Sequence, residues 1–240
     1  MRRLFSSMHF SIIIPVLNEA AVIRQTLQRL QPSRRRDVEV IVVDGGSSDG
    51  TPKLAKPLAD HVLSAAKGRA RQMNRGAQCA AGEYLLFLHA DTRLPDHWLS
   101  MLADVYERSA AWGRFDVRLS GRHWLLRVIE TMMNWRSRVT GIATGDQAIF
   151  VRRQLFERVG GFLDIALMED ILLSRRLRSC AAPVCLRDKV VTSSRRWEEN
   201  GIVKTVLLMW WLRLWFYFGA DADRLAHIYS ASDSKMNRQS

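Results

Sequence analysis

The amino-acid sequence predicts an α/β fold with a mostly parallel sheet flanked by helices. Short β-branched runs alternate with helical patterns of apolar residues along residues 10–111, as expected of βαβ units. The 240-residue length, with 48% hydrophobic and 25% charged residues, suits one domain with a sizeable core and excludes a disordered or fibrous chain.

The predicted elements of the first half follow one another closely. We expect strands at residues 10–15, 39–43, 61–63 and 84–88, and helices at residues 20–30, after Thr51, after Gly68 and at residues 96–110. The first helix carries Ile23, Leu27 and Leu30 on one face, at helical spacing. Asn18 stands where it would cap this helix.

The second half is less regular, and it contains no linker that would mark a domain boundary. We expect an edge strand at residues 112–119, a strand at 148–151, helices at 124–139, 152–159 and 170–178, an apolar helix at about 201–220 and a flexible tail at 230–240. This order predicts a single domain, residues 1–229, with a C-terminal helical extension.

Charge and cysteine content narrow the class of partner. The formal net charge of +12 favours polyanions or the phosphates of a small ligand, but the basic residues are scattered, so no nucleic-acid partner is expected. The chain has three cysteines, Cys79, Cys180 and Cys185, an odd number without the spacing of metal ligands. A disulfide framework or a zinc site is therefore not expected, which favours a reducing compartment. The interrupted N-terminal apolar stretch does not resemble a signal peptide, so a cytoplasmic location is expected.

Residues 206–220, VLLMWWLRLWFYFGA, form a Trp-rich apolar segment with Arg213 at its centre. The segment is short for a membrane span. Two alternatives remain: the helix packs onto the domain or a second subunit, or it lies peripherally at the inner face of a membrane.

Three polar residues follow predicted strands directly. Asn18, Asp44 and Asp91 each lie just beyond a strand. Ligands of open α/β sheets gather beyond the carboxyl ends of the strands. The sequence therefore predicts that these side chains converge on one cleft.

Six segments, in order, resemble the motif series of family 2 glycosyltransferases across residues 10–200: SIIIPVLNEA, VIVVDGGSSDGT, KGRARQMNRGA, YLLFLHADT, TGDQAIFVRR and MEDILLSRRL. The resemblance implies a GT-A, Rossmann-like fold with a nucleotide-binding half at about 10–111 and an acceptor half at about 112–200. It also implies an inverting transfer of a sugar from a nucleotide-diphosphate donor, for which a UDP-sugar is expected, to an unknown acceptor hydroxyl.

The resemblance places the donor nucleotide beside the first two strands. Pro15 and Glu19 would wall the nucleotide, and Asp44 would contact its base or ribose. The alternative for Asp44 is a turn cap, because Asp is favoured in turns.

Basic residues supply candidate phosphate contacts. Lys67, Gly68 and Arg69 precede a predicted helix, whose N-terminus favours anions. Their alternative is a solvated basic loop. Arg196 partly matches the Arg-Trp element of processive members and is a further candidate, against an ordinary surface arginine. Ser193 replaces the Gln of that element, and single transfer rather than polymerisation is expected.

The tetrapeptide HADT corresponds to the family's D-x-D motif, which holds a divalent cation against the diphosphate. Ala90 and Asp91 would lie at the donor, and Mg²⁺ or Mn²⁺ would be held by Asp91. His89 replaces the first acid. We expect His89 either to ligate the metal or to donate a hydrogen bond to phosphate, with a structural histidine as the alternative.

The resemblance assigns the acceptor chemistry to acids of the second half. Asp170 would be the base that takes the acceptor proton, and Glu169 a supporting group. Asp146 would orient the acceptor hydroxyl or substitute as base. The alternative for Asp170 is a carboxylate that only stabilises a helix N-terminus.

Two other classes of function compete with this one. The first is a catalytically inactive protein of the same fold that binds anionic lipid or nucleic acid, favoured by His89 in place of an acid. The second is a nucleotidyltransferase, disfavoured because no Gly-rich phosphate loop ends in Lys or Arg near the N-terminus.

Overall fold

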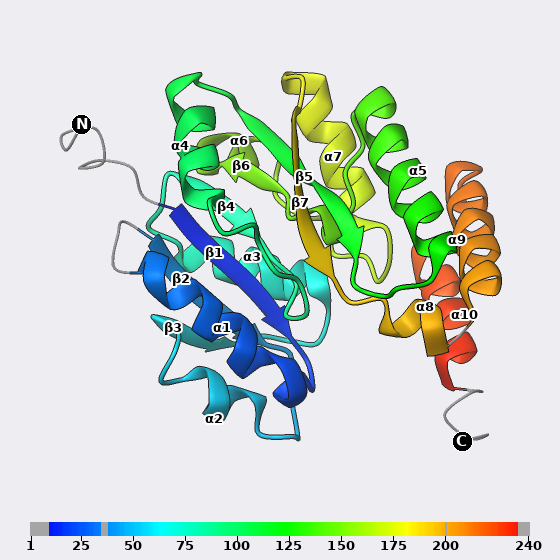
Figure 1. The fold of residues 1–240 in the computed structure, drawn as a ribbon, viewed down its shortest axis with the longest axis horizontal. Helices are drawn as coiled ribbons and strands as arrows, with labels where there is room; N and C mark the ends of the chain where they lie inside the picture. The colour runs from blue at the N-terminus through cyan, green and yellow to red at the C-terminus, as the bar shows by residue number, and fades with distance from the viewer. Residues whose placement is uncertain (1–9, 35–37, 200, 235–240) are drawn as a thin grey trace.

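A computed structural model describes residues 10–34, 38–199 and 201–234. Within these residues one sheet has the strand order β3-β2-β1-β4-β6-β5-β7 (Figure 1). Its strands are β1 Phe10–Val16, β2 Val38–Asp44, β3 His61–Ser64, β4 Tyr84–Phe87, β5 Trp112–Leu119, β6 Phe150–Arg152 and β7 Val184–Thr192. The helices are α1 Ala20–Arg34, α2 Thr51–Ala55, α3 Arg69–Cys79, α4 Trp98–Glu107, α5 Trp124–Thr140, α6 Arg153–Arg158, α7 Glu169–Cys180, α8 Arg195–Glu199, α9 Ile202–Tyr217 and α10 Ala222–Ser234, with a 3-10 turn, η1, at Gly145–Gln147.

The sheet is mostly parallel, which confirms the predicted fold class. Strand β1 pairs in parallel with β2 and β4, β2 with β3, and β5 with β7. Only β6, among the described strands, runs antiparallel to its neighbours β4 and β5. The parallel strands β1, β2 and β4 consequently direct their carboxyl ends to one edge of the molecule.

Helices cover both faces of the sheet, which explains the near-continuous apolar runs in its strands. Alternate side chains of β1 point to opposite faces. Ile12 and Ile14 pack with α1, α2 and α4, whereas Ile13 packs with α3, α6 and α7. Ile23, Leu27 and Leu30 are the buried apolar face of α1, as their spacing predicts.

Asn18 does not cap α1, contrary to the expectation from sequence. Its backbone φ is 55°, in the left-handed region, and its Oδ1 accepts the Ser48 N–H at 2.9 Å. The amides at the start of α1 instead donate to residues just before and at the start of α2. Thr51 Oγ1 accepts the Glu19 N–H and Asp49 Oδ2 accepts the Ala20 N–H, both at 2.9 Å. Asn18 thus joins the loops that follow β1 and β2.

Strand β5 was predicted as an edge strand, and this is wrong: it lies between β6 and β7. The edge is formed by β7, which the sequence pattern missed. Arg187, Asp188 and Lys189 interrupt its apolar pattern, and the β5–β7 register shifts between Phe115 and Asp116. The strand is therefore bulged and charged, as edge strands often are.

The C-terminal region forms two helices that pack on the start of α7. Leu212 of α9 and Leu225 of α10 are buried with Met168 and Ile171. The sequence predicted α9 but not α10, which extends to Ser234 and so replaces the first part of the expected tail; residues 235–240 lie outside the described residues. No helix in the described part of the chain is both long enough and apolar enough to traverse a bilayer.

Candidate active site

A cleft of about 480 Å³ is lined by residues at the carboxyl ends of β1 and β4, at the N-terminus of α7 and on α9. It gathers most of the residues singled out from the sequence: Pro15, Glu19, Lys67, Gly68, Arg69, His89, Ala90, Asp91, Asp146, Glu169 and Asp170. Residues from both halves of the chain therefore meet in one place.

Gln72 of α3 fixes the wall of the cleft beside β1. Its buried Nε2 donates to Val16 O at 2.8 Å and to Val43 O at 2.7 Å, and these two bonds link the carboxyl ends of β1 and β2. Sequence reasoning missed this residue, because a glutamine on an amphipathic helix carries no signal of a tertiary bond.

Asp44 ends β2 but does not line the cleft. Its Oδ2 accepts the Gly46 N–H at 3.0 Å, and both carboxylate oxygens accept the Ser47 N–H at 3.1–3.2 Å. Asp44 therefore caps the turn after β2, which is the alternative that the sequence offers to a contact with the base or ribose. Asp44 nevertheless lies at the same sheet edge, paired in register with Val16.

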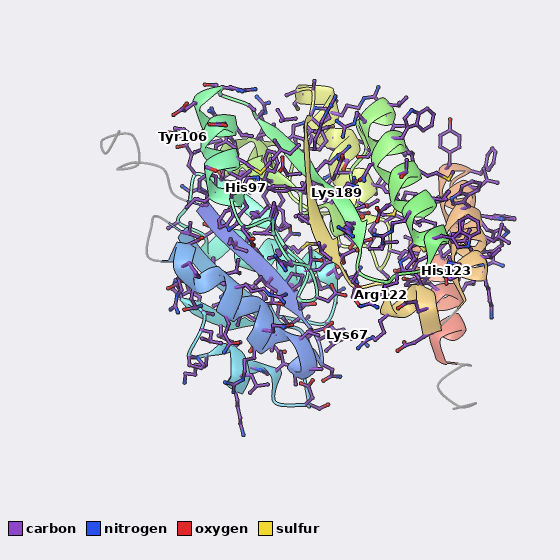
Figure 2. The ribbon with its side chains drawn as sticks, in the orientation of Figure 1. Lys67, His97, Tyr106, Arg122, His123 and Lys189 are labelled. Carbon is purple, nitrogen blue, oxygen red and sulfur yellow. The ribbon has the colours of Figure 1, made fainter. Side chains whose placement is uncertain are left out.

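The loop before α3 presents Lys67, Gly68 and Arg69 to the cleft, and Figure 2 shows Lys67 near the carboxyl end of β1. Gly68 has a φ of 140°, a conformation that residues with a Cβ rarely adopt. The chain can therefore turn sharply into α3, and the free amides at the start of that helix favour an anion.

His89 and Asp146 form a pair across the cleft, with 3.4 Å between His89 Nδ1 and Asp146 Oδ1. Burial opposes ionisation of Asp146, but the hydrogen bond and charge of His89 outweigh it, so the pKa of Asp146 lies below its ordinary value. The other ring nitrogen of His89 packs on Gly145, where a Cβ would lie 2.6 Å from Nε2. The imidazole is thus held by the protein on both sides.

Asp91 lies exposed at the mouth of the cleft, close enough to Glu19 for the two carboxylates to interact. Burial and the charge of Asp91 raise the pKa of Glu19. No cluster of three or more His, Cys, Asp or Glu ligands occurs within the described ranges. Mg²⁺ commonly takes only one or two protein carboxylates and completes its shell with substrate phosphates and water. Asp91 fits that arrangement, whereas His89 is already engaged.

Asp170 and Glu169 open α7, where the helix dipole favours negative charge. Asp170 Oδ2 accepts the Gly145 N–H at 2.8 Å, and its Oδ1 accepts the Ile171 N–H at 2.7 Å. Glu169 is buried. Loss of water and the charge of Asp170 raise the pKa of Glu169 to about 7.

Further residues line the cleft. Arg195 and Trp197 reach it from α8, and Arg213 reaches it from α9. Trp197 belongs to the Arg-Trp element that the resemblance indicated, whereas Arg195 and Arg213 had no signal in the sequence. An arginine in an apolar helix gives no hint of its direction until α9 is placed against α7. The side chain of Arg196 lies outside the described residues, so its phosphate contact stays a prediction.

Solved structures share this fold. A fragment of S. aureus TarS, solved with UDP-GlcNAc, superposes with a TM-score of 0.65 at 22% identity, covering 78% of this chain and 58% of that one. Glucosyl-3-phosphoglycerate synthase from Mycobacterium tuberculosis, solved with Mn²⁺ and UDP, gives 0.61 at 18% identity, covering 78% and 72%. The chain therefore has the GT-A glycosyltransferase fold.

The sequence comparisons identify the family. The family model of glycosyl transferase family 2 matches residues 11–160. A PGL/p-HBAD biosynthesis glycosyltransferase of Mycobacterium tuberculosis is 33% identical over 218 residues, which cover 82% of this chain and 80% of that protein. The probable glycosyltransferase YdaM of Bacillus subtilis is 28% identical over 84% of this chain and 52% of its own length. The chain belongs to glycosyl transferase family 2.

Proposed function

We propose that this enzyme transfers one sugar from a UDP-sugar to an acceptor hydroxyl with inversion at the anomeric carbon. The observation that supports this proposal most directly is the cleft, which is lined both by the loop at 67–69 and by Asp170 at the start of α7. The same cleft therefore offers basic groups for a diphosphate and a carboxylate for an acceptor proton. TarS and glucosyl-3-phosphoglycerate synthase, solved with UDP-GlcNAc and UDP, support a uridine nucleotide.

In this proposal the donor lies along the carboxyl end of β1. Pro15 and Glu19 flank the nucleotide, and Lys67 and Arg69 attract its diphosphate with the amides at the start of α3. Asp44 acts mainly by shaping the adjoining turn, with its charge at the edge of the base site. Arg196 remains a candidate phosphate contact from α8.

Asp91 would hold Mg²⁺ or Mn²⁺ together with the donor diphosphate, and the neighbouring Ala90 lines the same part of the cleft. A bound cation supplies charge neutralisation of the departing nucleotide diphosphate. The Mn²⁺ in the structure of glucosyl-3-phosphoglycerate synthase supports this assignment. We assign His89 to holding Asp146 through its Nδ1 rather than to ligating the metal.

Asp170 is the proposed base. Two backbone N–H groups orient its carboxylate. It takes the proton of the acceptor hydroxyl, whose oxygen forms the new bond to the anomeric carbon as the bond to the donor phosphate breaks and UDP leaves. Glu169 supports this step as a neighbouring acid that is half protonated near neutral pH. Asp146 faces the same space and orients the hydroxyl.

The exposed apolar surface of α5 and α9 is proposed as a membrane contact of an otherwise cytoplasmic enzyme. Its large side chains include Trp124 and Trp135 of α5 and Leu207, Trp210, Trp211, Leu214 and Trp215 of α9. Arg122 and His123 lie beside it, where Figure 2 labels them at the start of α5. Tryptophan and flanking cations suit the headgroup region of a bilayer.

Sedimentation with vesicles tests the membrane contact. We expect binding to phosphatidylglycerol vesicles, lost when Trp211 and Trp215 are both changed to Ser. A lipid-free dimer that the same change dissociates would instead assign this surface to a second copy.

UDP release from a panel of UDP-sugars tests the function, with pyrophosphate measured in parallel. Sugar-dependent UDP release supports a glycosyltransferase, and pyrophosphate release would favour a nucleotidyltransferase. Thermal shifts separate catalysis from simple binding: stabilisation by UDP with Mn²⁺ supports the proposal. Stabilisation by an oligonucleotide alone would favour the inactive binding protein.

A further inference from the structure

Two arginines that approach each other beside the cleft form no hydrogen bond or ion pair with another side chain in the part of the chain that the structure describes. Arg136 comes from α5 and Arg213 from α9, two helices that run next to each other in Figure 1. The Nε and Nη2 atoms of Arg136 and the Nε atom of Arg213 are buried and donate no hydrogen bond to any described residue. Neither side chain takes part in an ion pair found within the described ranges.

Two neighbouring arginines, by contrast, do have ion-pair partners. Arg114 is ion-paired with Asp116, and it also donates to Asn134 O at 3.2 Å. Arg138, two residues after Arg136 on α5, donates to both oxygens of Asp116 at 2.8 Å. Asp116 thus serves both of these arginines and leaves no carboxylate for Arg136.

Electrostatics between Arg136 and Arg213 are unfavourable. Burial removes water from Arg136 and is the largest cause of a lowered pKa, and the charge of Arg213 lowers it further. The pKa of Arg136 falls to about 10 as a result. Asp170 is the opposing carboxylate, and its two oxygens are already engaged by backbone amides. A buried cation without a partner is costly, and a bound anion removes that cost.

The arginine pair lies beside the acids assigned to the acceptor side. Arg213 lines the cleft, and its charge acts on Asp146, one of the acids on the acceptor side. The charge of Arg136 acts with that of Asp170, the proposed base. Arg69, a candidate contact of the donor diphosphate, lies in the same cleft, and its charge also acts on Asp146. The arginine pair is therefore placed next to the proposed base and to Asp146, where an acceptor would be held.

We propose that Arg136 and Arg213 form an oxyanion subsite that holds a phosphate group of the acceptor. This inference rests on the proposed transferase function and names the class of its acceptor. Two guanidinium groups without an ion-pair partner among the described residues match a phosphate monoester, which carries about 1.5 to 2 negative charges at neutral pH. Guanidinium also binds phosphate through paired hydrogen bonds. A hydroxyl near the held phosphate would then face Asp170.

Titration of inorganic phosphate into the enzyme saturated with UDP and Mn²⁺ tests the subsite, because the donor phosphate site is then filled. We expect binding to the wild type and a loss of affinity of about tenfold or more in Arg136→Gln and in Arg213→Gln. UDP affinity should stay unchanged in both variants. Arg118→Gln is the matched control, an exposed arginine of β5 whose change should alter neither affinity.

Equal phosphate affinity in all four proteins would overturn the subsite, as would a parallel loss of UDP affinity, which would assign the arginines to the donor. Failure of the wild type to bind UDP would contradict the transferase function instead; phosphate titrated without UDP would then still test the arginines.

Vesicles distinguish the two sources of a phosphate group. Binding to phosphatidic acid in phosphatidylcholine vesicles that Arg136→Gln and Arg213→Gln weaken, and Arg118→Gln does not, supports a lipid-borne phosphate. Arginine-dependent binding of inorganic phosphate without arginine-dependent vesicle binding supports a soluble phosphorylated acceptor.

Discussion

The Gly145 N–H donates a hydrogen bond of 2.8 Å to Asp170 Oδ2. This bond joins the 3-10 turn η1 to the first residues of α7, two segments that are far apart in the sequence. It aims one oxygen of the proposed base at a fixed point of the cleft. On the other side of the same turn, Gly145 leaves room for the ring of His89.

Gly145→Ala should destabilise the protein, because the new Cβ would lie 2.6 Å from His89 Nε2. We expect the free energy of unfolding, measured with urea, to fall by about 1–3 kcal/mol. His89→Ala in the same chain should restore part of this loss, since it removes the clashing ring. Full stability of the single variant would show that the ring moves away freely.

Stability should depend on pH through Glu169. Its pKa rises from 4.5 to about 7 in the folded protein, so the native state binds more protons than the unfolded state between these values. The free energy of unfolding should therefore decline as pH rises from about 4.5 to 7, by on the order of 3 kcal/mol from this group.

Urea unfolding at pH 5 and pH 8 measures the effect, and Glu169→Gln is the control because it cannot titrate. The difference between the two pH values should be smaller in the variant. An identical pH dependence of variant and wild type would remove Glu169 as its source.

Asp91→Asn should weaken binding of UDP in the presence of Mn²⁺ by about tenfold or more, because an amide is a poorer ligand for a hard cation than a carboxylate. UDP affinity measured with EDTA should change little. Asp96→Asn is the control, a carboxylate that is 89% exposed and lies outside the cleft. A Mn²⁺ response unchanged in Asp91→Asn would refute the assignment.

Two arginines on one helix should respond in opposite directions. Arg136→Leu removes a buried cation without a partner and should raise the free energy of unfolding by about 1–3 kcal/mol. Arg138→Leu removes both hydrogen bonds to Asp116 and should lower it by a similar amount. Urea unfolding without phosphate measures both, and a destabilised Arg136→Leu would contradict the unpaired state of this side chain.

The core sheet was predictable because its strands are buried on both faces and bounded by turns. Phe10–Val16 and Val38–Asp44 are near-continuous apolar runs, and the sequence predicted each within one or two residues. Strand β7 was missed because charged residues dominate its centre. Asn18 was misplaced because the competing caps, Asp49 and Thr51, come from another loop, and such a long-range choice leaves no local signal.

The site divides in the same way. Asp91 was predicted from its place at the end of a strand, and Asp170 from the resemblance of its segment to a motif of the family. The role of Arg136 and Arg213 could not be predicted in this way, because it depends on how closely α5 approaches α9. Their spacing in the sequence gives no indication of that approach, and only the missing partners in three dimensions reveal it.

The most direct test of the account is UDP release and UDP affinity in Asp170→Asn, measured with the best donor of the UDP-sugar panel. The account predicts that release falls by about 10² to 10⁴-fold, the usual contribution of a general base, while UDP binds with unchanged affinity. Undiminished release, or weakened UDP binding with turnover intact, would contradict it.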